Sequence, residues 1–211
     1  MTINRFCTSG LDAISIAASK VHSASQHIIV AGGVESVSRV PMFSDEGAWF
    51  SQPHVSEQSK FLHMGVSADL MAELGNINRS QLDAFAVRSH QLANKAQKEN
   101  RFQRSLVPVS LNNETVLTHD ELIRENASLE TLASLEPSFG PFLSTKQKEM
   151  IAAELPTLAE FQHVHHVGNS PSLADGAALV VIGNTDAAEK LNKPPLAKII
   201  GTLTIAEHPM L

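Results

Sequence analysis

The residue best suited to covalent chemistry is Cys7, the single cysteine in a sequence of 211 residues. Residues 2–6 have the pattern of an extended segment, and the small residues after Cys7 open a predicted helix. A thiol at such a junction lies beside free backbone N–H groups and the positive end of a helix dipole, which favour a negatively charged sulfur. Two interpretations of this position are open: a nucleophile with room for a substrate, or a buried structural cysteine.

A glycine pair and a histidine cluster are the other candidates for a site. Residues 32–36 (GGVES) close a predicted strand, and ligands of open α/β sheets bind at the carboxyl ends of strands; a turn that needs glycine is the simpler explanation. No dinucleotide or P-loop fingerprint occurs, so these loops give no support for nucleotide binding. His163 and His165 share one side of a predicted extended segment, but zinc needs a third or fourth ligand. We therefore expect no metal and interpret the cluster as a histidine-rich loop that leads to Gly168.

The elements that must position these residues follow an α/β pattern. Residues 9–24 carry apolar side chains at helical spacing, with Ser9 and Asp12 as a predicted capping box. Residues 26–31 are a short apolar run typical of a buried strand, so strand, helix and strand form a βαβ unit and predict a parallel sheet. The pattern returns later, where we expect strands at 176–183 and 196–205 and a helix at 185–191.

A long polar stretch with helical islands separates the two parts of this pattern. The clearest island is residues 80–99, where Ser80 and Asp83 resemble a capping pair. Its apolar residues at helical spacing predict a core-facing stripe of Leu82, Phe85, Ala86, Leu92 and Ala96. Further expected elements are a strand at 106–110 and an amphipathic helix at 145–160 that Pro156 interrupts. The sequence thus predicts a large insertion between two strands of one sheet.

Composition excludes several classes of partner. The formal net charge is −6 and 43% of the residues are hydrophobic, which describes an ordinary soluble globular chain without the basic surface that nucleic acid requires. No apolar run approaches the ~20 residues of a membrane span, and the first residues do not form a signal peptide. A single cysteine argues against a disulfide framework and favours a reducing, cytoplasmic compartment.

Four segments, taken in order, resemble the thiolase family. They are residues 4–11 (NRFCTSGL), residues 31–42 (AGGVESVSRVPM), His63-Met64-Gly65, and Gly168-Asn169 followed by residues 175–178 (DGAA). Each segment is similar to a family motif, and their shared order along the chain makes the resemblance specific. On this resemblance Cys7 corresponds to the family's nucleophile.

The resemblance implies an α/β fold in which two similar halves stack as αβαβα layers, with a loop domain inserted in the first half. We expect this thiolase-like fold in an incomplete form. Its expected parts are residues 1–36 in the N-terminal half, residues 37–167 as an inserted CoA-binding loop domain, residues 168–193 as the return to the N-terminal half, and residues 194–211 as the start of the C-terminal half.

The resemblance also implies acyl transfer between a coenzyme A thioester and a cysteine. Cys7 becomes acylated and its backbone N–H helps to hold the thioester oxygen; the thioester is a substrate, and no tightly bound cofactor is expected. Arg124 suits the nucleotide phosphates of CoA, because a guanidinium matches phosphate geometry. The expected partners are CoA or acyl-CoA and a second chain, either an identical copy or a complementing thiolase chain. The positions that match the family's CoA contacts are His63, Met64, Arg124, Thr131, Phe139 and Ser172.

The sequence departs from the family pattern in two respects. Pro171 occupies the place of a serine that contacts pantetheine, and Ser172 is the expected substitute. The family's N-E-A-F, G-H-P and C-x-G segments, which supply the oxyanion-hole asparagine, the histidine base and a second cysteine, do not occur in these 211 residues. We therefore expect the chain alone to turn over poorly or not at all. Two alternatives stay open: a CoA- or lipid-binding module without turnover, and a non-functional fragment of a split gene.

Overall fold

The computed structural model describes all 211 residues, which divide into two compact units. We call them the sheet unit, which comprises Met1–Asp45 and Leu173–Ala206, and the insertion unit, which comprises Glu46–Ser172 and Glu207–Leu211. A long insertion between two paired strands is therefore present. The four domain ranges given above, and their roles, stay predictions.

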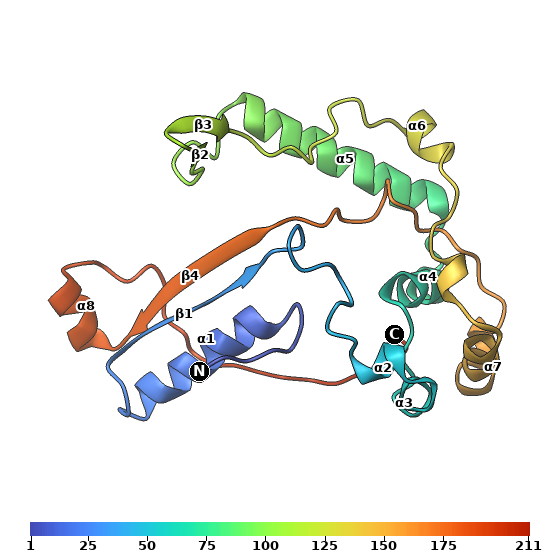
Figure 1. The fold of residues 1–211 in the computed structure, drawn as a ribbon, viewed down its shortest axis with the longest axis horizontal. Helices are drawn as coiled ribbons and strands as arrows, with labels where there is room; N and C mark the ends of the chain where they lie inside the picture. The colour runs from blue at the N-terminus through green and yellow to red at the C-terminus, as the bar shows by residue number, and fades with distance from the viewer. The chain divides into compact units, whose positions relative to one another are not determined.

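The sheet unit combines helices and strands, and the insertion unit is mainly helical. The elements of the sheet unit are α1 (Ser9–His22), β1 (Ile28–Glu35), β4 (Gly176–Gly183) and α8 (Thr185–Leu191) (Figure 1). The elements of the insertion unit are α2 (Ala48–Ser51), α3 (Pro53–Gln58), α4 (Met64–Leu74), α5 (Arg79–Lys98), β2 (Val109–Leu111), β3 (Glu114–Leu117), α6 (Leu129–Ala133), α7 (Thr145–Glu154) and the 3-10 turns η1 (Gly140–Phe142) and η2 (Pro156–Leu158). The predicted helices are confirmed with small shifts, and the predicted break at Pro156 separates α7 from η2. None of the helices combines the length and the apolar composition that a membrane crossing requires.

The two long strands pair with each other although they lie far apart in the sequence. β1 and β4 run antiparallel over their full lengths. A Cβ atom at Gly32 would overlap the carbonyl oxygen of Ala178, so the close approach of the two backbones requires glycine there. The strand predicted at residues 26–31 therefore exists, but it continues through the glycine pair to Glu35.

Two expectations about this sheet are wrong. The βαβ pattern predicted a parallel sheet, but the paired strands are antiparallel, and neither residues 2–6 nor residues 196–205 form a strand. A strand requires a neighbouring edge to bond with, which local sequence does not provide. The last segment has no such neighbour, and its Leu196 and Ile200 are 104% and 93% exposed.

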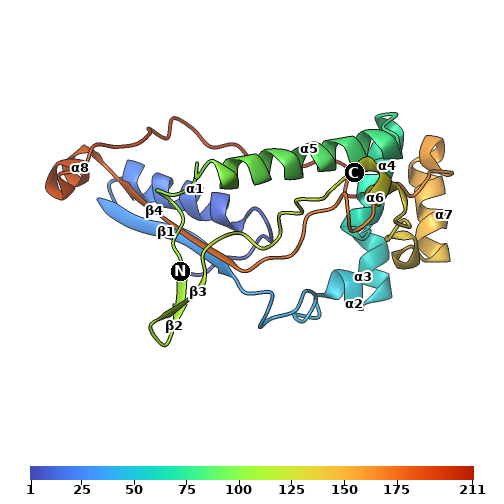
Figure 2. The same ribbon diagram turned by 90° about the horizontal axis from the view of Figure 1, so that it is seen from above.

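α1 covers one face of the β1–β4 pair and leaves the other face open. Figures 1 and 2 both show α1 lying along the two strands. Side chains alternate between the faces of a strand, and on the covered face Ala31 is buried, as is Ala17 of α1. On the opposite face Val30 and Leu179 are 61% and 75% exposed. The sheet unit thus presents an apolar surface.

α5 turns a different face to the interior than expected. Its N-terminus is closed by a capping box that begins at Asn78, so the predicted pair of Ser80 and Asp83 is wrong. Asp83 instead lies inside the unit, 3% exposed. In the predicted core stripe, Phe85 and Leu92 are 72% and 54% exposed. The buried residues of α5 are therefore Asp83 and Val87, and the predicted apolar stripe is covered only in part.

The apolar core of the insertion unit gathers around α4 and α7. Met210 is fully buried in it, so the last residues of the chain pack in this unit. The buried members of the cluster are Leu62, Val66, Leu70, Leu143, Ile151, Leu158 and Met210.

A short hairpin, β2–β3, lies at the surface of the same unit. Its two turn residues, Asn112 and Asn113, have φ of 51° and 67°. Two positive φ values in a two-residue loop are typical of a type I′ turn, which asparagine tolerates. The strand predicted at residues 106–110 is therefore displaced and begins at Val109.

Candidate functional site

Cys7 is exposed at the turn that leads into α1. The N-cap of α1 is Thr8, without a side-chain bond to the helix, so the predicted capping box of Ser9 and Asp12 is wrong. Phe6 adopts a φ of 49°, which ends the extended segment in front of the cysteine. Exposure excludes the interpretation of Cys7 as a buried structural cysteine.

Arg5 holds this turn closed from both sides. Its backbone N–H donates to Ser9 Oγ at 2.7 Å, and its carbonyl oxygen accepts from Thr8 Oγ1 at 2.8 Å. Its guanidinium Nη2 donates to Asp12 Oδ1 at 2.6 Å, one turn into the helix. These contacts fix the backbone on which Cys7 is presented at the N-terminus of α1.

The second and fourth family-like segments meet in the sheet unit. Asp175, just before β4, accepts hydrogen bonds from the backbone N–H of Ser38 at 3.0 Å and from its hydroxyl at 2.5 Å. The Ser38 hydroxyl, followed by its backbone N–H, lowers the pKa of Asp175 below its usual value. Segments 137 residues apart in the sequence are thereby joined at one end of the β1–β4 pair.

His63 caps α4 and packs against two aromatic rings that also contact each other. Its Nδ1 accepts from the backbone N–H of Gly65 at 3.1 Å. Its ring centroid lies 5.4 Å from that of Phe139 and 4.3 Å from that of Phe142, both in stacked geometry. Burial lowers the pKa of His63, which favours the neutral imidazole in this stack. Met64 is 67% exposed beside it.

The packing of Phe139 explains why the H-M-G motif ends in glycine. A Cβ atom on Gly65 would overlap the ring of Phe139. The structure thus brings together two predicted CoA contacts, His63 and Phe139, and shows that the third residue of the motif serves their packing.

Arg124 and Thr131 line one shallow depression of about 350 Å³, together with residues 125–127 and Leu132. The backbone N–H of Arg124 donates to His90 Nδ1 at 3.1 Å, and its Nη2 donates to the carbonyl oxygen of Val167 at 3.4 Å. The structure therefore places these two predicted CoA contacts side by side. Ser172, the last predicted contact, is exposed at the end of the insertion unit.

The sequence analysis missed two buried aspartates that organise the histidine-rich segment. Asp69 of α4 is fully buried. It accepts from His163 Nδ1 at 2.6 Å, from His165 Nδ1 at 2.7 Å, and from the backbone N–H groups of Val164 and His165, each at 3.0 Å. Burial raises the pKa of Asp69, but the histidine and backbone hydrogen bonds together outweigh it and lower the pKa. The two histidines considered for zinc therefore serve a carboxylate, and no group of three or more His, Cys, Asp or Glu side chains is arranged to hold a metal ion.

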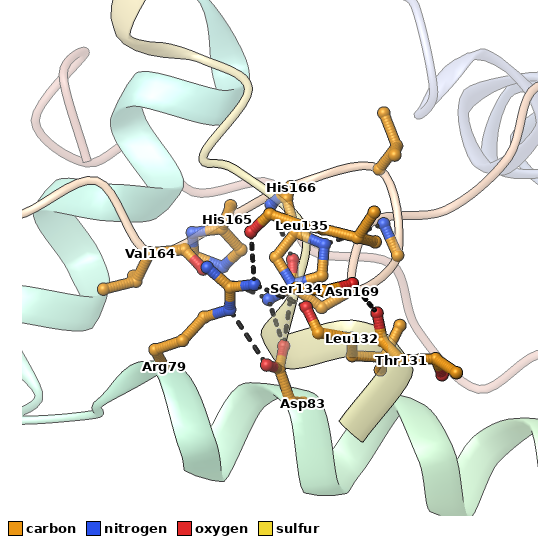
Figure 3. Close-up of polar contacts among 12 residues, drawn as sticks. Arg79, Asp83, Thr131, Leu132, Ser134, Leu135, Val164, His165, His166 and Asn169 are labelled. Atoms are coloured by element: carbon orange, nitrogen blue, oxygen red, sulfur yellow. Dashed lines mark hydrogen bonds and ion pairs between the residues drawn. The ribbon is translucent and has the colours of Figure 1, made fainter. Parts of the chain in front are cut away.

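Asp83 of α5 is the second buried carboxylate, and it bonds three side chains (Figure 3). It accepts from Arg79 Nε at 2.9 Å, from His166 Nε2 at 2.8 Å and from Asn169 Nδ2 at 3.0 Å. His166 is itself fully buried. Burial raises the pKa of Asp83, but these hydrogen bonds and the charge of Arg79 outweigh it and lower the pKa.

One signal in the sequence points to these two residues. Asp69 and Asp83 each stand within an apolar helical segment, where a charge is expected to be buried only with partners. The histidines that bond these two aspartates lie between 83 and 96 residues further along the chain, just before Gly168.

Comparison with known proteins places these features in a family. Residues 1–186 match the family model described as the thiolase N-terminal domain. A probable acetyl-CoA acyltransferase from Staphylococcus aureus (strain COL) is 32% identical over 216 residues, which cover 95% of this chain and 50% of that protein. A β-ketoadipyl-CoA thiolase from Pseudomonas aeruginosa is 31% identical over 230 residues, which cover 100% of this chain and 52% of that protein.

Solved structures agree with the sequence relatives. The dimeric peroxisomal thiolase of Saccharomyces cerevisiae superposes with a TM-score of 0.67 at 28% identity, covering 91% of this chain and 45% of that one. An acetyl-CoA acetyltransferase from Syntrophomonas wolfei gives a TM-score of 0.67 at 30% identity, covering 90% and 46%. The fold is a partial thiolase-like α/β fold, as predicted. The chain belongs to the thiolase family, and it spans about half the length of the curated relatives it matches.

Proposed function

We propose that this chain accepts an acyl group from a coenzyme A thioester onto Cys7, the first half-reaction of thiolase chemistry. The observation that carries the proposal is the exposed thiol at the N-terminus of a 14-residue helix, within the stretch that matches the thiolase N-terminal domain. The helix dipole there favours negative charge.

The proposed step is an acyl exchange between two sulfur atoms. The Cys7 sulfur attacks the thioester carbonyl carbon, the bond from that carbon to the CoA sulfur breaks, and the thiol proton of Cys7 ends on the released CoA. The Cys7 backbone N–H holds the carbonyl oxygen as negative charge develops on it. The position of a Cβ atom at Gly10 has no atom within 4 Å, so the helix start has open space beside it.

The insertion unit is proposed to hold CoA. His63, Met64 and Phe139 supply an aromatic and apolar surface for the pantetheine or adenine groups. Arg124 and Thr131, which share a depression, supply a cation and a hydroxyl for the nucleotide phosphates. Ser172 is proposed as the polar contact that replaces the family serine.

The proposal also includes the association of the chain with a partner chain and its cellular compartment. The chain is proposed to act in a reducing, cytoplasmic setting and to associate with a second copy of itself or with a complementing thiolase chain. Its exposed apolar sheet face supports such association. Full turnover is expected only with a chain that supplies the second half of the fold. Size-exclusion chromatography with light scattering tests the association.

Intact-mass spectrometry after incubation with acetyl-CoA or acetoacetyl-CoA tests the acylation. We expect one acyl adduct, mapped to Cys7 by peptide analysis, and none on Cys7→Ala. The absence of an adduct, even with a complementing second-half chain, overturns the proposal. If calorimetry then shows CoA binding that survives Cys7→Ala, the chain is a CoA-binding module; if it shows none, a fragment without function is favoured.

A further inference from the structure

We propose that Asp83 is a positioning residue that fixes α6 and the Arg124 side chain at the Arg124–Thr131 depression and thereby gives the chain its selectivity for the nucleotide end of CoA. The inference deepens the proposed function and rests on it. Asp83 does not line the depression itself. It acts through Arg79 on α6, and through the segment that carries His166 and Asn169 on Arg124.

α6 forms one wall of the depression, because it carries Thr131 and Leu132. Arg79 donates from Nη2 to the carbonyl oxygen of Leu132 at 2.7 Å and to that of Leu135 at 2.8 Å. These are carbonyl groups at the end of α6, which has only five residues. The other side of the guanidinium is fixed by Asp83, whose Oδ2 accepts from Nε at 2.9 Å. The position of α6 therefore depends on the Asp83–Arg79 pair.

The segment around Val167 does not line the depression, but the Val167 carbonyl oxygen accepts from Nη2 of Arg124, which does, at 3.4 Å. The residues on either side of Val167 are held by one oxygen of Asp83, which accepts from His166 Nε2 at 2.8 Å and from Asn169 Nδ2 at 3.0 Å. Figure 3 shows His166 and Asn169 converging on the carboxylate that also faces Arg79.

The segment around Val167 also approaches α6 directly. A Cβ atom on Gly168 would lie 2.5 Å from Leu132 Cδ2 and 2.7 Å from Leu135 Cδ1. The segment can approach α6 this closely only with glycine. A shift of α6 or of this segment therefore moves the other, and both are held through the same Asp83 carboxylate.

A carboxylate suits this place better than an amide. All three side chains that reach it present N–H donors, and an ionised aspartate is an acceptor on both oxygens. Asparagine would turn an NH₂ group toward at least one of these donors. Asp83→Asn is thus nearly isosteric but leaves a donor facing a donor in the interior.

Calorimetry of the full chain with CoA and with pantetheine, which lacks the nucleotide, tests the proposal. We expect the wild-type chain to bind CoA more tightly, and Asp83→Asn to reduce the ratio of the two affinities about tenfold, the effect of one displaced hydrogen bond to a charged group. Binding of pantetheine should change little. Arg124→Gln should reduce the same ratio, and the double variant Asp83→Asn/Arg124→Gln should be no worse than Arg124→Gln alone.

Asp69→Asn is the matched control, because it removes the other buried carboxylate that holds the same histidine-rich segment. It should lower the melting temperature as Asp83→Asn does but leave the affinity ratio unchanged. If Asp83→Asn does not fold, Arg79→Lys takes its place, since lysine keeps the charge without the forked geometry and should also reduce the ratio.

Two results overturn the proposal in distinguishable ways. A wild-type chain that prefers CoA, with a ratio that Asp83→Asn and Arg79→Lys leave unchanged or that Asp69→Asn reduces equally, overturns the positioning role alone. A wild-type chain that binds neither CoA nor pantetheine overturns the proposed function together with it.

Discussion

Replacing Asp69 by asparagine should destabilise the insertion unit strongly, because this side chain has no exposed surface and only donors around it. The amide keeps one acceptor oxygen and places an NH₂ group where the second oxygen was. With that oxygen still accepting the two backbone N–H groups, the NH₂ group faces the Nδ1–H of His163. Asparagine has nearly the same volume as aspartate, so the loss of stability comes from electrostatics and not from a cavity.

The expected loss follows from the contacts that are broken. One short hydrogen bond to a charged acceptor is lost, a donor is left facing a donor, and the negative charge that two imidazoles share disappears. Leaving such a buried group unmatched lowers the free energy of unfolding by about 3 kcal/mol. For a chain of this size that corresponds to a fall in melting temperature of about 6–12 °C.

The pH dependence gives a second and sharper measurement. The pKa of Asp69 is lowered in the folded protein, so its ionisation contributes stability that is fully present above the unfolded pKa of about 4 and is lost as the pH falls below it. The difference in free energy of unfolding between wild type and Asp69→Asn should therefore shrink as the pH falls below about 4. Asp83, whose pKa is also lowered, titrates in both proteins and cancels from the difference.

Urea denaturation followed by circular dichroism at a series of pH values makes the measurement. Asp120→Asn is the control, because Asp120 is exposed in the same unit, and it should stay within about 0.5 kcal/mol of wild type. If Asp69→Asn unfolds within the same margin at pH 7, or if its difference from wild type grows as the pH falls, the assignment of an ionised, hydrogen-bonded Asp69 is wrong.

Three further outcomes are expected. Gly65→Ala should lower the free energy of unfolding by about 1–3 kcal/mol, because the added Cβ overlaps the ring of Phe139. Gly201→Ala should not, because the space around Gly201 is open. Equal stability of the two variants contradicts the packing of Gly65 against Phe139. Met210→Ala should lower the free energy of unfolding, measured by heat or urea, by about 2–5 kcal/mol, because its side chain is fully buried. Leu203→Ala, at 86% exposure, should be nearly neutral. If Met210→Ala is also neutral, the last residues lie outside the core. Cys7 should react with iodoacetamide in the folded chain at a rate close to that in urea, because it is exposed; strong protection of Cys7 without ligand would contradict that exposure.

Elements with strong local signals were predictable from the sequence. The run GAALVVIG forms β4 at the predicted residues, and the helix at 185–191 and the break at Pro156 also lie where the pattern places them. Apolar spacing and proline geometry are properties of a short stretch of chain, so one sequence contains them in full.

Features that depend on a distant partner were not predictable. β1 has the apolar run of a strand, but its orientation is decided by β4, which lies beyond the insertion. In the same way the inward face of α5 is chosen by His166 and Asn169, which bond Asp83, and not by the stripe that contains Phe85. Local periodicity could not show this, because the partners of Asp83 lie 83 and 86 residues further along the chain.

The family-like segments divide into residues for which chemistry is proposed and residues that shape the protein. Gly65 and Gly168 are required by side chains that pack where a Cβ would stand, and Asp175 joins two segments of the sheet unit. Such residues are evidence for the fold, and substitutions of them are expected to act on its stability. Evidence for acyl transfer depends instead on Cys7, which is exposed and holds no other element in place. Evidence for CoA depends on Arg124 in its depression. Substitutions of Cys7 and Arg124 therefore distinguish a loss of the proposed function from a loss of stability.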